Sequence, residues 1–478
     1  MRVSFLKYIK LKSSMTYDLL LKNVKAFTTS GPFEGDIAIK DGKISKIGGD
    51  IQEQADKTID LSGKYLMPGL IDGHTHMEFP FMGEVTADDF YYGSRAAVAG
   101  GVTTIVDFVT PAKGQDLLSA YEKWRNNADP KVVSDYGLHM IIREVNTKIL
   151  EQIPEVINKG VVSFKLFMAY KNELMLPDGE LYKLIKRISD FGGVTGIHAE
   201  NGEIINELIQ EFLSEGKIDP IYHYYSRPDI MEIEATNRIA SIASMIGKDV
   251  KMYIVHTSTG EAVDIISSYR RQGFKFFNET APHYLTLNTD FLKRPDGYRY
   301  VMSPPLRSDE QRTKLWMRLA SGDIFTIGSD HCVYSDAQKK RYKEEVPPFN
   351  EIPNGVPGTE NILPILFYYG VKKGIISMER FVEVTSYNPA RLFGLYPRKG
   401  TIMPGSDADF AVIDPNRKVR ISADVLHSNI NYTIYDGMEV EGWNVMTIRR
   451  GEVVYEEGQV IGKKGSGKYI PGKTPILL

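Results

Sequence analysis

Two histidines one residue apart, His74 and His76, are the first residues in the chain whose spacing suggests chemistry. They end an apolar run that starts at Leu66, and side chains of a β-strand alternate between its two faces. Both imidazoles therefore project from the same side of a strand end, where they could hold one metal ion. An isolated pair of this kind is more often two surface histidines in a turn, so its interpretation depends on the rest of the chain.

Four more candidate ligands occur later in the chain, each within or directly after its own strand-like run. They are Lys165, His198, His256 and Asp330. Either of the later histidines alone would more often be a satisfied core or loop residue than a ligand. Because all six candidates fall at strand ends, the sequence predicts a metal site.

Lys165 is the unusual member of this set, because it lies in the apolar run 161–167. An ammonium ion is costly to bury in such a run. A lysine whose stem packs on the strand while its amine reaches the surface would avoid this cost. The functional interpretation is an uncharged amine that has reacted with carbon dioxide, giving a carbamate able to bridge two metal ions.

The candidate ligands lie in a middle segment where strand-like and helix-like runs alternate. Eight strands with interleaved helices predict a (β/α)8 TIM barrel, an α/β fold whose active site lies at the carboxyl ends of the strands. A doubly wound open sheet is the alternative, but no glycine-rich phosphate turn follows the first strand. The strand-like runs are 66–72, 102–108, 136–141, 161–167, 194–198, 251–256, 275–279 and 324–329, and helix-like runs include 116–127, 178–190, 230–246, 261–271 and 309–320.

Both ends of the chain are rich in strand-like runs, with a hairpin turn at Asp41 and Gly42. We predict one small β-sandwich domain built from residues 17–67 and 396–462, with the barrel at 68–395. The segment 463–478 is expected to be a C-terminal tail. Residues 462–468 resemble the first part of a phosphate-binding P-loop, but Tyr469 occupies the Ser/Thr position, so a flexible tail is the preferred interpretation.

The composition is that of an ordinary globular protein. A net charge of −3 gives no reason to expect nucleic acid or an anionic membrane surface as a partner. The single cysteine, Cys332, excludes an internal disulfide framework. Residues 1–14 lack the apolar core of a signal peptide, and no window is long and apolar enough to span a bilayer. We therefore expect a cytoplasmic protein, for which Met15 is an alternative start.

Several segments around the candidate ligands are similar to those of one known family. The most specific are the lysine-containing block 163–170 and the loop 352–358, which contains Pro353, Asn354 and Gly355. The His74-Thr75-His76 segment and the segments 198–201, 303–306, 329–331 and 400–410 fit as well. Over residues 17 to 462 the chain resembles the dihydropyrimidinase/hydantoinase family of the amidohydrolase superfamily. That resemblance implies hydrolysis of a cyclic ureide to an N-carbamoyl amino acid.

The resemblance also implies a binuclear centre with two divalent metal ions per subunit. His74, His76, Asp330 and a carbamylated Lys165 would hold the more buried ion, and the same Lys165 with His198 and His256 would hold the other. Zinc is the expected metal because imidazole and carboxylate-type ligands suit it, with manganese or cobalt as alternatives.

Four residues receive further roles from the resemblance. Tyr170 would polarise the substrate and stabilise its oxyanion, and Ser303 and Asn354 would grip the ring amide. Asp330 would act as the proton carrier between the attacking water and the leaving nitrogen. The family resemblance further implies a homotetramer, in which the C-terminal tail could dock on a neighbouring subunit.

Related functions compete with this interpretation. Dihydroorotases carry an arginine two residues after the histidine pair, which binds the carboxylate of their substrate. Glu78 stands there instead, so we expect an uncharged ring. An allantoinase-like hydrolase is the nearest alternative. A non-catalytic scaffold homologue would have lost ligand positions that are intact here, and a phosphotriesterase-like enzyme would not explain the Ser303 and Asn354 loops.

The remaining histidines and the cysteine are expected to have supporting roles. His331, beside Asp330, could orient the metal ligands. We expect His283 to be structural, and Cys332 to be a packing residue. His139, His223 and His427 are expected to be satisfied or solvated.

Overall fold

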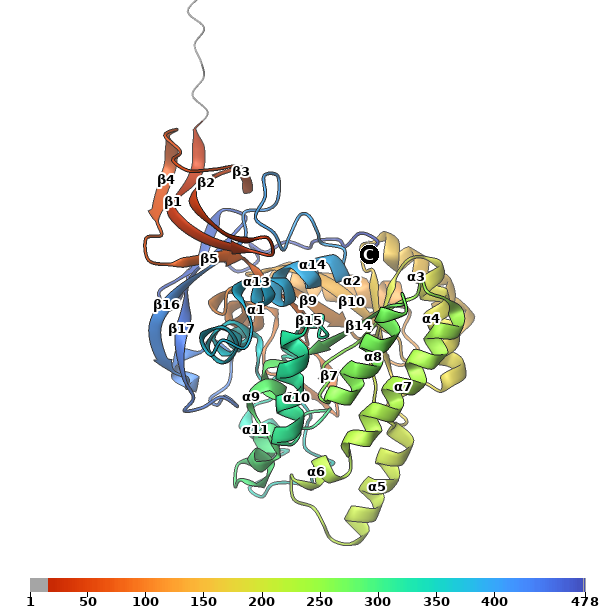
Figure 1. Cartoon of the computed structure of the whole chain (residues 1–478). Helices are drawn as coiled ribbons and strands as arrows, with labels where there is room; N and C mark the ends of the chain where they lie inside the picture. The colour runs from red at the N-terminus through yellow and green to blue at the C-terminus, as the bar shows by residue number, and fades with distance from the viewer. Residues whose placement is uncertain (1–15, 476, 478) are drawn as a thin grey trace, which may run out of the picture.

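The structure is a computed structural model that describes residues 16–475 and residue 477 (Figure 1). The two predictions about the first 15 residues, that they contain no signal peptide and that Met15 is an alternative start, lie outside the described residues. Among the residues that are described, no helix is long and apolar enough to cross a membrane.

Eight parallel strands form the central barrel in the order of the chain. A parallel pairing of Thr75 with His331 joins the segment after the last strand to the first strand. The (β/α)8 prediction is therefore confirmed. The strands are β6 (Leu70–Thr75), β9 (Val102–Val109), β10 (Asp135–Ile141), β11 (Ser163–Phe167), β12 (Val194–His198), β13 (Lys251–Ile254), β14 (Lys275–Thr280) and β15 (Thr326–Ile327).

Most of the long helices surround the barrel (Figure 1), and their buried apolar residues belong to the same core cluster as those of the strands. Helix α4 shows the pattern: its buried residues Leu181, Leu184, Ile185 and Ile188 recur at intervals of three and four. The main helices are α1 (Phe90–Ala99), α2 (Leu117–Ala128), α3 (Thr147–Asn158), α4 (Asp178–Asp190), α5 (Gly202–Ser214), α7 (Asp229–Ile246), α8 (Gly260–Arg271) and α10 (Asp309–Ala320). Shorter ones include α6 (Tyr222–Tyr225), α9 (Pro282–Thr286), α11 (Asp336–Lys339), α12 (Ile362–Ile365), α13 (Met378–Val382) and α14 (Asn388–Leu392).

A second sheet of nine strands lies beside the barrel and combines both ends of the chain (Figure 1). Strand β5 joins the two contributions, because it pairs with β1 on one side and with β16 on the other. The small β-domain assembled from both termini is thus confirmed. Its strands are β1 (Tyr17–Thr28), β2 (Gly31–Lys40), β3 (Lys43–Gly48), β4 (Ala55–Asp60), β5 (Tyr65–Pro68), β16 (Phe410–Arg420), β17 (Glu439–Arg449), β18 (Glu452–Glu456) and β19 (Gln459–Val460).

The segment after this sheet is bound to the barrel of its own chain, so the prediction of a flexible tail is wrong. The amide of Tyr136 donates to the Lys468 carbonyl at 2.9 Å, and the amide of Ile470 donates to the Tyr136 carbonyl at 2.7 Å. The amide of Gly472 donates to the Gly160 carbonyl at 2.9 Å. These partners lie at the amino ends of β10 and β11. The segment therefore crosses the end of the barrel at which the strands begin, here called the closed end. Glycines here permit that close approach: a Cβ on Gly467 would lie 1.9 Å from the Ser134 carbonyl oxygen.

Candidate metal centre

The six predicted ligands come together at the carboxyl ends of five barrel strands. His74 lies in β6, Lys165 in β11 and His198 at the end of β12. His76, His256 and Asp330 lie one to three residues beyond the ends of β6, β13 and β15. All six side chains are buried, and the most accessible residue, Asp330, is only 8% exposed. Except for His74, they line one cavity together with Tyr170, Ser303 and Asn354.

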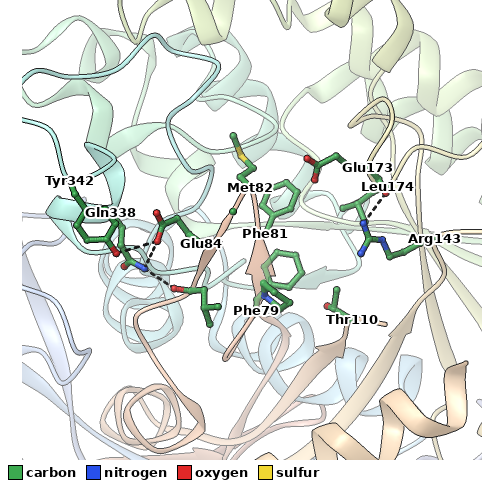
Figure 2. Close-up of a pocket in the computed structure, with 13 residues that line it drawn as sticks. Phe79, Phe81, Met82, Glu84, Thr110, Arg143, Glu173, Leu174, Gln338 and Tyr342 are labelled. Atoms are coloured by element: carbon green, nitrogen blue, oxygen red, sulfur yellow. Dashed lines mark hydrogen bonds between the residues drawn. The ribbon is translucent and has the colours of Figure 1, made fainter. Parts of the chain in front are cut away.

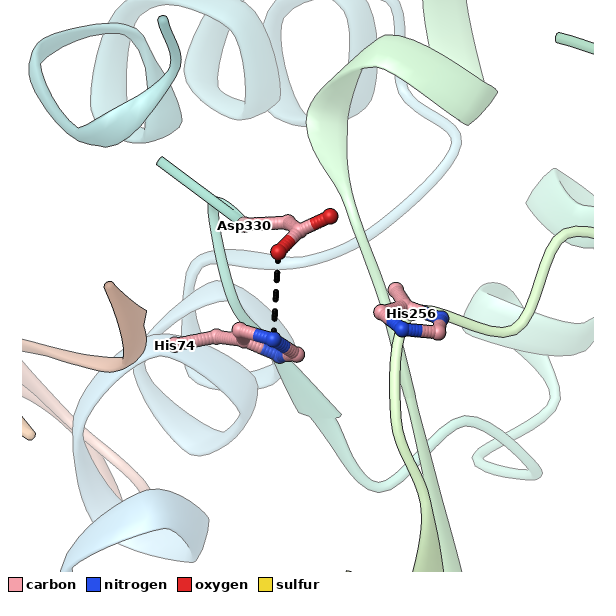
Figure 3. Close-up of side chains that lie close together, drawn as sticks. All are labelled: His74, His256 and Asp330. Atoms are coloured by element: carbon pink, nitrogen blue, oxygen red, sulfur yellow. Dashed lines mark ion pairs between the residues drawn. The ribbon is translucent and has the colours of Figure 1, made fainter. Parts of the chain in front are cut away.

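Asp330 and three histidines form the geometric centre of the group. The Oδ1 atom of Asp330 lies 3.1 Å from Nε2 of His74 and 3.3 Å from Nε2 of His76. His74, His256 and Asp330 each offer a ligand atom within 4.8 Å of the others (Figure 3). On the other side, Nδ1 of His198 lies 3.0 Å from Nε2 of His256. This donor set of imidazoles and a carboxylate is one that could hold a divalent metal ion.

Buried ring nitrogens without hydrogen bonds support the same interpretation. Nδ1 of His76 and Nδ1 of His256 have no hydrogen-bond partner among the described residues, and Nε2 of His74 has only the Asp330 carboxylate at 3.1 Å beside it. A buried polar atom without a partner is uncommon in a folded protein and requires an explanation such as an ion. The residues present therefore fit a metal centre.

Two glutamates orient the histidines from behind. Nδ1 of His74 lies 2.6 Å from Glu279 Oε1, and this oxygen also accepts the backbone N–H of His256 at 3.2 Å. Nε2 of His198 lies 2.7 Å from Glu200 Oε2, which also contacts Arg227 at 3.2 Å. A carboxylate that accepts one ring N–H leaves the other nitrogen of the imidazole free to bind metal.

Neither glutamate was assigned from the sequence. Glu279 ends the seventh predicted strand, and this position at the catalytic face was the signal that could have identified it. Glu200 lies two residues after His198, inside the segment 198–201 that resembles the family, but the resemblance implies no role for this carboxylate.

Three of the predicted site residues have backbone angles that non-glycine residues rarely adopt. The φ angles of Tyr170, His256 and Asp330 are 66°, 35° and 50°. Such strain costs about 1–3 kcal/mol per residue and concentrates at functional sites. It also explains why the expected strand 251–256 ends at Ile254, two residues before the histidine.

Burial and the neighbouring charges set the protonation of the site. Burial lowers the pKa of Lys165 to about 7, although Asp330 and Glu279 oppose this shift. Burial also lowers the pKa of His76 to about 4 and places that of His256 well below its usual range. For Asp330, burial alone would raise the pKa, but the adjacent histidines outweigh it and hold the pKa well below the usual range. At neutral pH the imidazoles of His76 and His256 are therefore expected to be neutral and the Asp330 carboxylate to be ionised. With a pKa of about 7, Lys165 has a substantial fraction of its amine in the neutral form.

The residues predicted to bind substrate form a polar group on one wall of the cavity. Nδ2 of Asn354 donates to Oγ of Ser303 at 3.0 Å, and both residues line the cavity with Tyr170. Burial raises the pKa of Tyr170 to about 12, so its hydroxyl remains a donor at neutral pH. Nε2 of His223 lies 3.1 Å from Ser303 Oγ and 2.8 Å from the Met302 carbonyl oxygen. His223, expected only to be satisfied, therefore supports the Ser303 loop.

The other walls of the cavity are apolar. They contain Phe79, Phe81, Phe167, Leu174 and Cys332. Among the described residues that line it, Lys165 is the only one with a cationic side chain. A second cavity of about 620 Å³ opens on the other side of Phe79 and Phe81, where Arg143 and Glu173 lie on one flank and Glu84 on the other (Figure 2).

Glu78 does not line the metal cavity. The prediction of an uncharged substrate from the identity of this residue therefore rests on a side chain that does not face the site. Its φ angle of 51° follows the end of β6, and its carboxylate accepts a hydrogen bond from Asn127 at 2.8 Å and pairs with Lys131. The strand alternation that placed the histidines does not extend to this residue. The apolar walls, with Lys165 as the only cationic side chain among the described residues that line the cavity, now carry the expectation of an uncharged ring.

The remaining histidines have local partners or none. Nε2 of His331 lies 2.9 Å from Asp88 Oδ2, and its Nδ1 accepts the amide of Gly358 at 3.1 Å. His139 and His427 also have hydrogen-bond partners on their rings. Both ring nitrogens of the buried His283 lack a partner among the described residues.

Comparison with known proteins places these observations in a family. The model of the amidohydrolase family matches residues 65–454. The chain is 42% identical over 455 residues to the D-hydantoinase of Geobacillus stearothermophilus, with 94% of this chain and 96% of the relative covered. It is 40% identical over 446 residues to the dihydropyrimidinase of Rattus norvegicus, covering 91% and 85%. The crystal structure of dihydropyrimidinase from Brevibacillus agri NCHU1002 superposes with a TM-score of 0.93 at 40% identity, covering 96% and 99%.

Proposed function

Because this chain belongs to the amidohydrolase family, we propose that it hydrolyses the cyclic amide bond of dihydropyrimidines or hydantoins and releases an N-carbamoyl amino acid. The observation that carries the proposal is one buried cavity at the carboxyl ends of the barrel strands. It joins the strand-end ligand set to the Ser303–Asn354 pair and to apolar walls that suit an uncharged ring. The named relatives are hydantoinases and dihydropyrimidinases, which favours this substrate class over an allantoinase-like one.

We propose further that the six ligand residues, with Lys165 carbamylated, would hold two divalent metal ions, zinc first among them. The lowered pKa of Lys165 supports this, since the neutral amine is the form that reacts with carbon dioxide. When bound, the ions would supply Lewis acidity that activates water and polarises the scissile carbonyl. Mn²⁺ and Co²⁺ would suit the same ligands.

The protein residues divide the remaining work. Asp330 is ionised at neutral pH, so it can take a proton from the attacking water and later deliver it to the leaving ring nitrogen. Tyr170 keeps its hydroxyl proton and can donate to the oxyanion that develops on the carbonyl. Ser303 and Asn354 hold the ring amide in place, and the apolar walls exclude bulk water.

A side-by-side assay tests the function. Hydantoin, dihydrouracil, allantoin and dihydroorotate are offered to the purified chain, and release of the N-carbamoyl product is measured. Hydantoin and dihydrouracil should be turned over far faster than dihydroorotate. The variant His198→Ala should lose activity, whereas the matched control His427→Ala, which removes a histidine outside the cavity, should keep it. Preference for allantoin or dihydroorotate, or no hydrolysis by metal-loaded wild type, would reject the proposal.

Assembly and location extend the proposal. The family resemblance supports a homotetramer that acts on a small-molecule ureide, and the single cysteine supports our proposal of a cytoplasmic location. Light scattering on the purified chain should give a mass four times that of the monomer. A monomeric enzyme with full activity would contradict the assembly without affecting the chemistry.

A further inference from the structure

A single helical turn, α11 (Asp336–Lys339), follows the last barrel strand at the catalytic face. Its start is fixed by a capping box between Ser335 and Gln338, in which each side chain bonds the other residue's backbone N–H. The turn therefore holds its own side chains in a defined direction. It begins six residues after Asp330 in the chain.

The last residue of the turn, Lys339, is completely buried and binds two backbone carbonyls. Its Nζ donates to the carbonyl of Val301 at 2.8 Å and to that of Pro353 at 2.8 Å. It forms no ion pair with any described carboxylate, and burial lowers its pKa to about 7. Both the ammonium and the amine have at least two N–H bonds, so either form can make both contacts.

These two carbonyls belong to the two loops that carry the proposed substrate grip. Val301 lies two residues before Ser303, and Pro353 directly precedes Asn354. The loops also touch directly, through the amide of Gly355 on the Val301 carbonyl at 3.0 Å and through Asn354 Nδ2 on Ser303 Oγ at 3.0 Å. Lys339 adds a third connection from a separate element, so the loops are fixed relative to the barrel as well as to each other.

We propose that Lys339 is a positioning residue for substrate binding, which holds Ser303 and Asn354 in the relative position that grips the ring amide. This role rests on the proposed function. Lys339 does not line the metal cavity, so it acts through the two loops rather than by touching the substrate. Nothing in its contacts reaches the six proposed metal ligands.

The neighbouring residue, Gln338, has a similar positioning role for the hairpin that carries Phe81. Nε2 of Gln338 donates to the Val85 carbonyl at 2.8 Å and to Glu84 at 3.2 Å, on the hairpin formed by β7 (Pro80–Phe81) and β8 (Glu84–Val85) (Figure 2). This hairpin carries Phe81 into the metal cavity. Two consecutive side chains of one turn thus hold three loops around the substrate position.

The test compares Lys339→Met with the matched control Lys340→Met. Methionine keeps the approximate length of the side chain but removes the lysine N–H donors from the buried carbonyls of Val301 and Pro353, and only that of Val301 still accepts the Gly355 amide. Because ground-state binding should be lost, KM for hydantoin should rise about 10- to 100-fold while kcat changes less. Metal content should equal that of wild type. The neighbouring Lys340 lies half-buried against Tyr298, and its variant should keep the wild-type KM.

Amide hydrogen exchange supplies a readout that does not depend on catalysis. Exchange at Gly355, whose N–H bonds the Val301 carbonyl, should accelerate in Lys339→Met and remain slow in Lys340→Met. Lys339→Arg retains N–H donors and should recover part of the substrate affinity. If the methionine variant does not fold, the arginine variant carries the test: a KM between wild type and tenfold higher, with faster Gly355 exchange, is expected.

The outcomes separate the two proposals. A normal KM and normal Gly355 exchange in Lys339→Met, beside an active wild type, would overturn the positioning role alone. Loss of metal in this variant would also overturn it, since the effect would then reach the metal centre. If wild type hydrolysed no cyclic ureide, the proposed function would fail and the role in substrate binding would fail with it.

Discussion

Two lysines at opposite ends of the barrel are buried to the same extent but have opposite surroundings. Lys165, at the catalytic face, and Lys399, at the closed end, are each 1% exposed. Nζ of Lys399 contacts Asp135 at 2.6 Å, Asp407 at 3.1 Å and also Asp409, and these aspartates raise its pKa although burial opposes them. The Lys165 amine instead lies about 5 Å from the ring centres of two phenylalanines, and its pKa falls to about 7.

The difference shows that the partners of a buried lysine decide its state. At the closed end the fold supplies the counter-charges itself, and Arg450 and the amide of Lys468 bind the same Asp135. This arrangement ties the barrel, the β-domain and the C-terminal segment together. At the catalytic face several buried ring nitrogens have no hydrogen-bond partner among the described residues, and the Lys165 amine lies against two aromatic rings instead of a carboxylate. A buried polar group without a partner in the protein requires another explanation, such as a bound ion or a covalent modification. The proposed metal ions and the carbamate on Lys165 provide that explanation.

The largest effect is expected from removing the unpartnered lysine. Lys165→Ala should lose both metal and activity, and the loss of activity should exceed the about hundred- to ten-thousand-fold that proton transfer alone contributes in rate. The free energy of unfolding of the metal-free protein should fall only by the cost of the cavity that the side chain leaves, because no ion pair is broken. Elemental analysis, a hydrolysis assay and urea unfolding check the three statements.

Short-chain carboxylic acids should partly restore Lys165→Ala, because they can replace the carbamate oxygens. Intact mass under non-denaturing conditions should show an added carboxyl group on wild type and none on the variant. An unmodified Lys165 in an active enzyme with two metals per chain would contradict the carbamate.

A smaller loss of activity is expected when the carboxylate of Asp330 is replaced by an amide. Asp330→Asn can still ligate weakly but cannot accept a proton, and proton transfer contributes about a hundred- to ten-thousand-fold in rate. The measurement is kcat at saturating metal. Recovery of wild-type turnover on adding metal would show that Asp330 serves only as a ligand.

The sequence predicted the catalytic face better than the closed end. The ligands could be found because strand periodicity and the order of the barrel place strand ends on one face, whatever their separation in the chain. The orientation of Glu78 could not be predicted, since the strand ends at Thr75 and a positive φ angle turns this side chain away. Lys399 lies between Arg398 and Gly400, which reads as an exposed turn. Its three aspartates become neighbours only after the two sheets meet.

Replacing Lys399, whose charge is paired with aspartates, should lower the free energy of unfolding but leave metal binding and turnover unchanged. Lys399→Met leaves Asp135, Asp407 and Asp409 buried together, and removing one partner from a buried network costs about 3–5 kcal/mol. Urea unfolding should show this loss, while metal content and kcat of the folded fraction stay at wild-type values. Stability equal to wild type would mean that the closed end gains nothing from this charge. Loss of metal from the folded variant would instead mean that the two ends are coupled.

The smallest effect is expected at the rim of the same cluster, where Lys43 pairs with Asp407 at 2.9 Å but is half exposed. Burial opposes ionisation of Asp407, but Lys399, Lys43 and Arg398 lower its pKa to about 2. The ionised carboxylate therefore stabilises the fold fully above about pH 4, the usual aspartate pKa, and this contribution is lost as the pH falls toward 2. Lys43→Ala should cost about 0–1 kcal/mol at pH 7, because exposed pairs contribute little.

Acid unfolding distinguishes this rim pair from a general loss of charge. Without Lys43 the pKa of Asp407 in the folded state should rise toward its usual value, so the variant has less stabilisation to lose on acidification. The gap in unfolding free energy between wild type and Lys43→Ala should narrow between pH 5 and pH 3. The matched control is Lys46→Ala, which breaks a similarly exposed pair with Glu53 and does not contact Asp407. If Lys43→Ala lost as much unfolding free energy as Lys399→Met, the greater exposure of Lys43 would not explain a smaller contribution to stability.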